Sequence, residues 1–176
     1  MLIGNDVIDL AFQKPLFRQF KNSRLNQKIF SDQELVLIDK EDNITSLRRW
    51  TMKEAAYKAY QRLYQLKPKF NPARIHTEIK DQKLGFAIIA EHQFKLKTEL
   101  NTDYIYTYIE NQNPQTSIRY ESKDDLITKL SDYFSAQSIS ISKDSLNIPS
   151  IYINDKSKPI SLTHHGSFQW AMFLLR

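Results

Sequence analysis

Three short stretches of this 176-residue sequence carry residue types and spacings that could do chemistry. The first is RRWTMKEAAYKAY, residues 48–60, which places Lys53, Glu54 and Lys58 within about one and a half turns of an expected helix. Glu54 and Lys58 are i and i+4, so their side chains lie on one face, one turn apart. Such a pair is either a surface ion pair, adding about 0.3–0.5 kcal/mol to the helix, or part of a site for a charged ligand.

The second stretch is GNDVID, residues 4–9, in which Asp6 interrupts an apolar run. An acid inside an apolar strand is unfavourable unless something compensates its charge. A divalent cation is one compensation, and carboxylate oxygens suit Mg²⁺. The alternative is an aspartate that ends a strand in a turn.

The third stretch is THHGSFQW, residues 163–170, with His164 and His165 side by side before a glycine. Adjacent residues of a strand point to opposite faces, so one zinc ion would not bind both imidazoles. The remaining alternatives are a structural imidazole and a histidine that meets a phosphate in a turn.

The elements that must position these residues can be read from the periodicity and from the caps. We expect a strand over residues 1–10, where Gly4 allows a bulge or a close backbone approach. A helix is expected at about 15–28, and Ser31 with Glu34 forms a capping box for the next one. A longer helix follows at about 47–66, with Thr45 or Ser46 as its cap.

Beyond the prolines that follow this helix, short segments rich in β-branched and aromatic residues predict strands. They lie at residues 75–79, 85–91, 94–97, 104–110, 139–142, 150–154 and 168–175, with a loop at 111–116 and a helix at 123–136. The pattern favours an α+β domain with an antiparallel sheet, helices early and strands late. We expect one domain over residues 1–176.

The composition excludes several classes of protein. An apolar share of 41% is enough for a core, and the absence of cysteine excludes disulfide frameworks and thiolate metal sites. No run of 18 apolar residues predicts a membrane span, and the first ten residues lack the basic region of a signal peptide. The expected location is the cytoplasm.

The net charge of +5 is concentrated in the first half of the chain. Residues 1–75 carry fourteen Lys/Arg and eight Asp/Glu, against eleven and twelve in residues 76–176. Between Leu10 and Ser31 there is no acid, and the cations are Lys14, Arg18, Lys21, Arg24 and Lys28. This patch would attract a polyanion, either an acidic protein, a nucleic acid or a phosphate-rich ligand.

Taken in order, three motifs resemble the 4′-phosphopantetheinyl transferase superfamily, holo-acyl-carrier-protein synthase type. The motif G-x-D is matched by Gly4-Asn5-Asp6. The helix motif is Trp or Phe, then two small or medium residues, then K-E-[AS]-x-x-K, and it is matched from Trp50 to Lys58. A late strand motif, S-[IL]-[ST]-H, is matched from Ser161 to His164. The helix motif is the specific one. The resemblance covers residues 1–75 well and about 142–176 loosely.

The resemblance implies a 4′-phosphopantetheinyl transferase-like fold, an antiparallel sheet packed against a long helix, with an elaboration at about 80–140. It implies a holo-[acyl-carrier-protein] synthase, as in fatty acid biosynthesis. The reaction would move 4′-phosphopantetheine from coenzyme A to a serine of an acyl or peptidyl carrier protein, releasing 3′,5′-ADP. Mg²⁺ would be the cofactor, because a divalent cation on carboxylates neutralises the pyrophosphate.

The resemblance also implies roles for individual residues. Asp6 and Glu54 would hold Mg²⁺, and Glu54 or a metal-bound water would take the serine proton. Glu54 and Lys58 would be catalytic, with Lys58 offsetting charge on the leaving group. The residues expected to bind coenzyme A are Lys58, Arg49, Lys53 and His164.

Two departures from the family pattern concern phosphate and metal binding. Longer relatives carry a Gly-Lys-Pro whose lysine meets a phosphate of coenzyme A, and here Ile148 stands in its place before Pro149. Many also carry a second acid two residues after the motif aspartate, where this chain has Ile8, followed by Asp9. A water would then complete the metal shell.

The partners follow from the same reasoning. An acidic carrier protein would dock on the basic side of helix 14–28, through Arg18, Lys21, Arg24 and Lys28, unless this is an ordinary solvated face. The resemblance implies a site between two copies of the fold, and the single copy of each motif here then predicts a homo-oligomer, a trimer being favoured over a monomer, with His164 of one subunit facing Asp6 and Glu54 of the next. No membrane or nucleic acid is expected as a partner.

Two other functions compete with this hypothesis. A basic half and the strand YIYTYI, residues 104–109, could form a nucleic-acid-binding module, although that function leaves Asp6 and Glu54 unexplained. A non-catalytic relative that binds carrier protein or coenzyme A is the second, favoured by the missing phosphate lysine and opposed by Asp6, Glu54 and Lys58.

Overall fold

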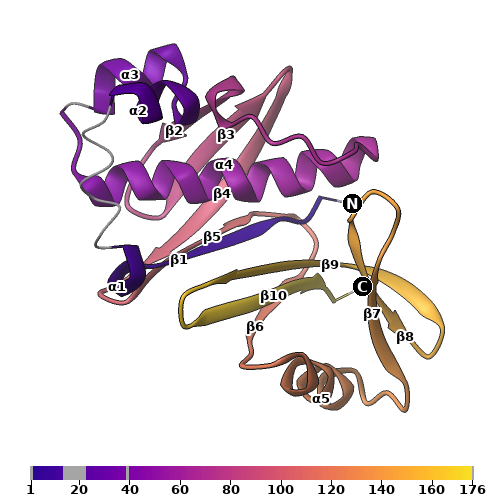
Figure 1. The fold of residues 1–176 in the computed structure, drawn as a ribbon. Coiled ribbons are helices and arrows are strands. Elements are labelled where there is room, and N and C mark those ends of the chain that lie inside the picture. The colour runs from indigo at the N-terminus through magenta and orange to yellow at the C-terminus, as the bar shows by residue number, and fades with distance from the viewer. Residues whose placement is uncertain (1, 14–22, 39, 176) are drawn as a thin grey trace.

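The chain forms two antiparallel five-stranded sheets joined near its middle (Figure 1). A computed structural model describes residues 2–13, 23–38 and 40–175. The first sheet has the order β1-β5-β4-β3-β2 and the second β6-β10-β9-β8-β7. The first contains β1 (Asn5–Asp9), β2 (Ile75–Ile79), β3 (Leu84–Ile89), β4 (His92–Leu100) and β5 (Tyr104–Ile109). The second contains β6 (Gln115–Arg119), β7 (Ile139–Lys143), β8 (Pro149–Ile153), β9 (Lys156–His165) and β10 (Phe168–Leu174).

The helices lie mainly in the first half of the chain. They are α1 (Leu10–Gln13), α2 (Ser23–Ile29), α3 (Asp32–Ile38), α4 (Asn43–Tyr64) and α5 (Lys123–Phe134), with a short 3-10 helix at Pro72–Arg74. Helix α4 crosses the first sheet, and α5 covers part of the second (Figure 1). None of the helices in the described ranges has the length and apolar character needed to span a membrane.

The two halves repeat one strand order. In each, the first strand is at an edge beside the last strand, and the others follow in reverse order of sequence. The expected mixture of helices and antiparallel strands is confirmed, with two sheets in place of one. The segment at about 80–140 contains the strands that complete the first sheet, and then β6 and α5, which begin the second half.

Local signals predicted most elements but missed two strands. Strand β6 occupies part of the expected loop at 111–116 and extends beyond it, and β9 was expected only through the late strand motif. The N-cap of α4 is Asp42, whose Oδ1 accepts from the Thr45 N–H at 2.7 Å, so the prediction of Thr45 or Ser46 as the cap is wrong. The capping box of α3 is confirmed, because Ser31 N–H donates to Glu34 Oε2 at 2.7 Å.

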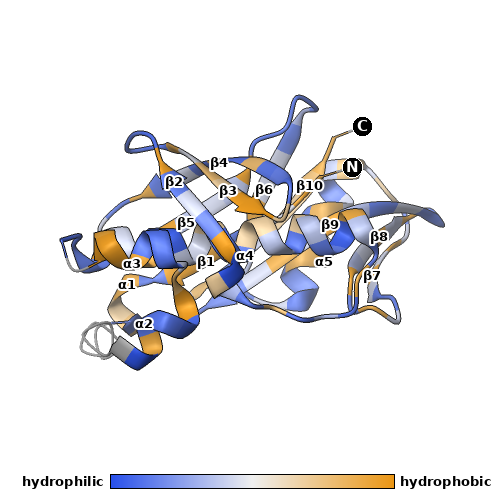
Figure 2. Cartoon of the chain, turned by 90° about the horizontal axis from the view of Figure 1, so that it is seen from above, coloured by the Kyte–Doolittle hydropathy of each residue, from blue (hydrophilic) through white to orange (hydrophobic). Residues whose placement is uncertain are grey.

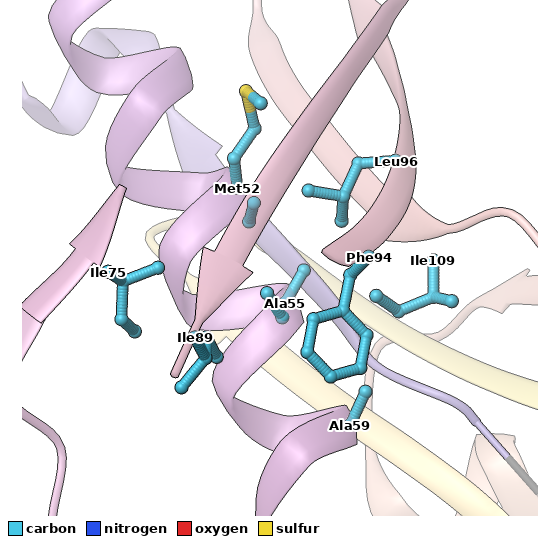
Figure 3. Close-up of a cluster of buried hydrophobic side chains, with 10 residues drawn as sticks. Met52, Ala55, Ala59, Ile75, Ile89, Phe94, Leu96 and Ile109 are labelled. Carbon is cyan, nitrogen blue, oxygen red and sulfur yellow. The ribbon is translucent and has the colours of Figure 1, made fainter. Parts of the chain in front are cut away.

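The small residues of α4 allow it to lie close to the first sheet. Ala55 and Ala59 are fully buried beside Phe94 of β4 (Figure 3). A Cβ on Gly4 would lie 2.1 Å from the carbonyl oxygen of Ala55, so only glycine fits there. The predicted close backbone approach at Gly4 is confirmed, and it brings β1, with Asp6, against the helix that carries Lys58.

Aromatic residues fill the junction between the two sheets. Tyr106 of β5 is 1% exposed and stacks on Trp170 of β10 with ring centroids 4.7 Å apart. Its hydroxyl lies 2.7 Å from Ser117 Oγ and accepts from Asn5 Nδ2. Figure 2 shows that most turns between strands are hydrophilic. Tyr106 therefore holds the two halves together and offers no stacking surface to a nucleic acid.

Candidate active site

The candidate site forms where β1 of the first sheet meets β9 of the second. Three backbone N–H groups of β1 donate to side chains of β9: Asn5 to Ser161 Oγ at 3.3 Å, Val7 to Thr163 Oγ1 at 3.3 Å, and Asp9 to His165 Nδ1 at 3.1 Å. Alternate residues of β9 thus point to β1, as the period of a strand requires. This explains the late strand motif, because its serine and threonine join the two halves.

Asp6 is buried between helix α4 and β9. Thr163 Oγ1 donates to Asp6 Oδ1 at 2.8 Å, and Lys58 Nζ lies 3.2 Å from the same oxygen. Lys58 Nζ also donates to the carbonyl oxygen of Asn5 at 2.8 Å. Both side-chain contacts are made by Oδ1, and within the described residues no hydrogen bond to Asp6 Oδ2 is found, so this second carboxylate oxygen remains for a ligand.

Glu54 lies one turn before Lys58 on α4 and faces the same region as Asp6. Burial, and to a smaller extent the Asp6 charge, raise the pKa of Glu54 to about 7 against the opposing effect of Lys58. Two carboxylates that repel each other at a buried site favour a bound cation. Asp6 and Glu54 come from different elements, and the fold brings them together.

These residues line two adjoining cavities. The larger has a volume of about 470 Å³ and the smaller about 210 Å³. The residues common to both are Glu54, Lys58, Lys143 and Leu162. Asp6, Trp50 and His164 line the larger cavity only. The two cavities therefore form one hollow, with Asp6 in the larger part, Arg62 in the smaller part, and Glu54, Lys58 and Lys143 where the two parts meet.

The donor set fits Mg²⁺ if a substrate completes the shell. Among the described residues, no group of three or more His, Cys, Asp or Glu side chains is arranged to hold a metal. Two carboxylates would leave coordination positions for phosphate oxygens and water, which is how Mg²⁺ commonly binds at phosphate-transfer sites. Asp6 and Glu54 are the residues that would hold it.

Asp9 has a structural role. Its Oδ1 accepts from the N–H groups of Ala11 and Phe12 at 2.9 and 3.1 Å, and its Oδ2 from Ser167 N–H at 2.9 Å. Burial alone would raise the pKa of Asp9, but these three backbone donors outweigh it and lower the pKa. Both oxygens are therefore used in capping α1 and in closing the turn before β10, so Asp9 does not replace the acid missing at Ile8.

The two histidines differ as expected for neighbours on a strand. His164 is exposed and lines the larger cavity, where a phosphate could reach it. His165 points to β1, where its Nδ1 accepts from Asp9 N–H and the Phe12 ring packs edge-on with centroids 5.2 Å apart. Both residues line the larger cavity, but His164 is exposed and open to a ligand, whereas His165 is held by its contacts with Asp9 and Phe12.

The contact between His165 and Gln13 has a chemical consequence. His165 Nδ1 accepts a hydrogen bond, so in the neutral ring Nε2 carries the proton and must donate. Gln13 Nε2 lies 2.7 Å from this nitrogen, while Gln13 Oε1 is buried without a partner. Since two donors cannot bond, the amide is better turned by 180°, with Oε1 accepting from His165.

Arg49 and Lys53 are not available to coenzyme A. The Arg49 guanidinium donates to Glu41 Oε1 at 2.6 Å and to the Thr77 carbonyl at 2.7 Å. Lys53 is fully buried, with its Nζ 2.5 Å from Glu34 Oε2. Neither residue lines either of the two cavities, so the expected binding of coenzyme A by Arg49 and Lys53 does not agree with the structure.

The described part of the expected docking helix is α2. Its cations Arg24 and Lys28 are exposed, whereas Arg18 and Lys21 lie outside the described residues. Helices α2 and α3 pack together around Phe30, and Trp50 of α4 packs against this cluster while it also lines the larger cavity. The basic surface is thus connected to the rim of the site.

The sequence analysis missed two cations near the site. Arg62 lines the smaller cavity. It follows Lys58 by four residues, as Lys58 follows Glu54, so the helical period could have predicted that all three share one face. Lys143 stands at the end of β7 and lines both cavities. A single lysine at a strand end gives no local signal, because only strand pairing brings it to the site.

Comparison with known proteins agrees with the motifs. The model of the 4′-phosphopantetheinyl transferase superfamily matches residues 2–109, which include Asp6, Glu54 and Lys58. Searches of curated proteins and of solved structures found no match. The family match covers more than half of the chain and contains the residues that the fold brings to one cavity; the chain belongs to the 4′-phosphopantetheinyl transferase superfamily.

Proposed function

We propose that the protein transfers 4′-phosphopantetheine from coenzyme A to a serine of an acyl or peptidyl carrier protein and releases 3′,5′-ADP. The observation that carries this proposal is the meeting of Asp6, Glu54 and Lys58 at one cavity. Two acids and a cation at a hollow large enough for phosphates are what transfer from a pyrophosphate requires. A relative that only binds its partners would not need the second carboxylate.

In the proposed reaction, the serine oxygen bonds to the phosphorus on the pantetheine side of the pyrophosphate. The bond from that phosphorus to the bridging oxygen breaks, and the oxygen leaves with 3′,5′-ADP. Bound Mg²⁺ would supply charge neutralisation on the phosphates. Lys58, held near Asp6, stabilises the charge that grows on the leaving phosphate.

Glu54 is the proposed acceptor of the serine proton. A general base is most effective when its pKa is near the working pH, and burial together with the Asp6 charge raises the pKa of Glu54 to about 7. His164 lies on the opposite wall of the larger cavity, from the second sheet, and is proposed to meet the nucleotide phosphates. The proposed location is the cytoplasm, where coenzyme A and carrier proteins meet.

A mass assay tests the function. Coenzyme A, Mg²⁺ and a panel of apo-carrier proteins are incubated with the protein, and a carrier is expected to gain about 340 Da, the mass of the transferred group. Omission of Mg²⁺ is expected to prevent the gain. Absence of both mass gain and coenzyme A binding, measured by calorimetry, would contradict the proposal.

We also propose that one chain is sufficient for activity. The sequence suggested an oligomer with His164 facing Asp6 of a neighbour, but the second sheet brings His164 to the Asp6 cavity of the same chain. The second half therefore supplies the wall that a partner subunit was expected to provide.

Complementation between inactive variants tests this single-chain site. Mixing Glu54→Gln and His164→Ala chains is expected to restore no activity beyond their sum, because each chain contains a complete but damaged site. Light scattering should give an active species near 20.8 kDa. Recovery of transfer in the mixture would show that the site is shared between subunits.

The basic surface of α2 is the proposed docking site for an acidic carrier protein. Replacing Arg24 and Lys28 by glutamate is expected to raise the KM for the carrier about tenfold, with a smaller effect at high salt. The KM for coenzyme A should stay constant. Lys123→Glu on α5 is the matched control, an exposed lysine in the second half of the chain. An unchanged carrier KM in the double variant would exclude α2 from docking.

A further inference from the structure

We infer that Lys143 binds a phosphate group of coenzyme A, in place of the lysine that this chain lacks at Ile148. This inference rests on the proposed function and extends it to a residue outside the family motifs. Lys143 lines both cavities together with Glu54 and Lys58. It stands on the second sheet, so it faces α4 from the other side of the hollow.

Strand pairing explains how a lysine five residues before Ile148 reaches the same place. Lys143 of β7 is directly opposite Pro149 of β8. Ile148, next to Pro149, is buried and also lines the smaller cavity. The two strands of this hairpin run in opposite directions, so Lys143 on β7 lies beside the place on β8 where longer relatives carry their lysine.

The β7–β8 hairpin is anchored on α4, which fixes the position of Lys143. Gln61 Nε2 donates to the carbonyl oxygen of Leu146 at 2.9 Å, and Arg62 donates to that of Pro149 at 2.7 Å. Both residues follow Lys58 on the same helix, within about one turn. Each anchor joins a side chain of the first half to the backbone of the hairpin, and so Lys143 keeps its place relative to Lys58.

The turn of the hairpin is closed by its own acid, Asp144, which follows Lys143 in the sequence. Asp144 Oδ1 accepts from the N–H groups of Leu146 and Ile148 at 2.8 and 2.9 Å. The ion pairs found among the described residues do not include Lys143. Its ammonium group is exposed at the cavity and can meet an anion there.

The charges around the hollow favour phosphate as that anion. Lys58, Arg62 and Lys143 line the smaller cavity, where Glu54 is the acid. The Arg62 guanidinium is used by the hairpin, and Lys58 is shared with Asp6, so Lys143 is the cation with the most freedom to follow a ligand. A flexible ammonium with three donors suits a phosphate oxygen.

Binding measurements separate this inference from the proposed function. Lys143→Gln is expected to raise the Kd for coenzyme A about tenfold by calorimetry, as for one charge-assisted hydrogen bond at a partly exposed site. Lys143→Arg should retain most of the affinity. Lys156→Gln is the matched control, an exposed lysine at the start of β9 that lines neither cavity. In transfer assays the KM for coenzyme A should rise and the KM for the carrier should not.

Dephospho-coenzyme A, which lacks the 3′-phosphate, identifies the contacted group. If the effect of Lys143→Gln persists with this ligand, Lys143 binds the pyrophosphate; if the effect disappears, it binds the 3′-phosphate. Both results support a phosphate contact. Equal coenzyme A affinity in Lys143→Gln and Lys156→Gln, with a wild type that binds and transfers, would overturn the inference alone. A wild type that neither binds coenzyme A nor transfers would overturn the proposed function with it.

Discussion

Replacing Glu54 by glutamine is expected to reduce transfer by about 10²–10⁴-fold while the protein stays folded. The change removes one of the two negative charges that face the cavity and removes the group proposed to take the serine proton. Volume and shape are almost unchanged, so the loss should appear in kcat more than in the KM for the carrier. Near-normal transfer at saturating Mg²⁺ would contradict both roles of Glu54.

The stability of the same variant gives a readout that does not depend on transfer. Burial and the Asp6 charge raise the pKa of Glu54 to about 7 from its ordinary 4.5. Between pH 4.5 and about 7 the folded chain keeps the Glu54 proton, whereas the unfolded chain has lost it. The free energy of unfolding is therefore highest, as far as Glu54 is concerned, at low pH, and it falls as the pH rises through about 7. Glutamine at position 54 does not ionise, so the variant does not lose this stability.

Without metal, the melting temperature of the wild type should therefore fall relative to that of Glu54→Gln as the pH rises. At pH 8 the Glu54→Gln protein is expected to melt about 5 °C above the wild type, and at pH 4.5 the difference should vanish. Adding Mg²⁺ at pH 8 should raise the melting temperature of the wild type and leave that of the variant unchanged. Equal Mg²⁺ shifts in both would remove Glu54 from the metal site.

The second large effect is expected at Lys53, and it concerns folding. Lys53→Met should lower the free energy of unfolding by about 3–5 kcal/mol, because it removes the closer of the two ion-pair partners of buried Glu34 and leaves it with Arg49 Nη1 at 4.0 Å. Glu34 is tied to the rest of the core through Thr77 N–H at 2.9 Å, so it cannot turn to solvent. Denaturant unfolding of the purified variant measures the change.

A double variant distinguishes structure from ligand binding. Glu34→Gln with Lys53→Met should be less destabilised than the sum of the single changes, because neither then leaves an unpaired charge. At a temperature where Lys53→Met is folded, its KM for coenzyme A should equal that of the wild type. A stable Lys53→Met protein with a raised KM would return Lys53 to the list of coenzyme A ligands.

The predictions from sequence that agree with the structure depend on neighbours along the chain. The capping box of Ser31 and Glu34 is a local signal, and so is the one-turn spacing of Glu54 and Lys58. Gly4 is a local signal of a different kind. Its lack of a side chain indicates that another segment packs closely against it, but the sequence does not show that this segment is the helix around Ala55.

What the sequence could not show depends on residues distant in the chain. Lys53 has the residue type of a phosphate ligand, and only the position of Glu34 makes it a core residue. Lys143 has the appearance of an ordinary surface lysine until β7 pairs with β8 beside the cavity. The strand order of the two sheets is equally non-local, because each first strand pairs with the last strand of its half.

The repeated strand order has a consequence for stoichiometry. The second half has a strand and a helix in the places of β1 and α4, but β6 (QTSIR) contains no acid. In α5, Asp125 and Lys129 reproduce the acid–lysine spacing of α4, yet they pair with each other at 2.8 Å on the surface. A lone carboxylate already neutralised by its lysine cannot form a second two-acid centre. If the proposed function holds, the two halves contain one reactive centre, and each chain should bind a single equivalent of coenzyme A.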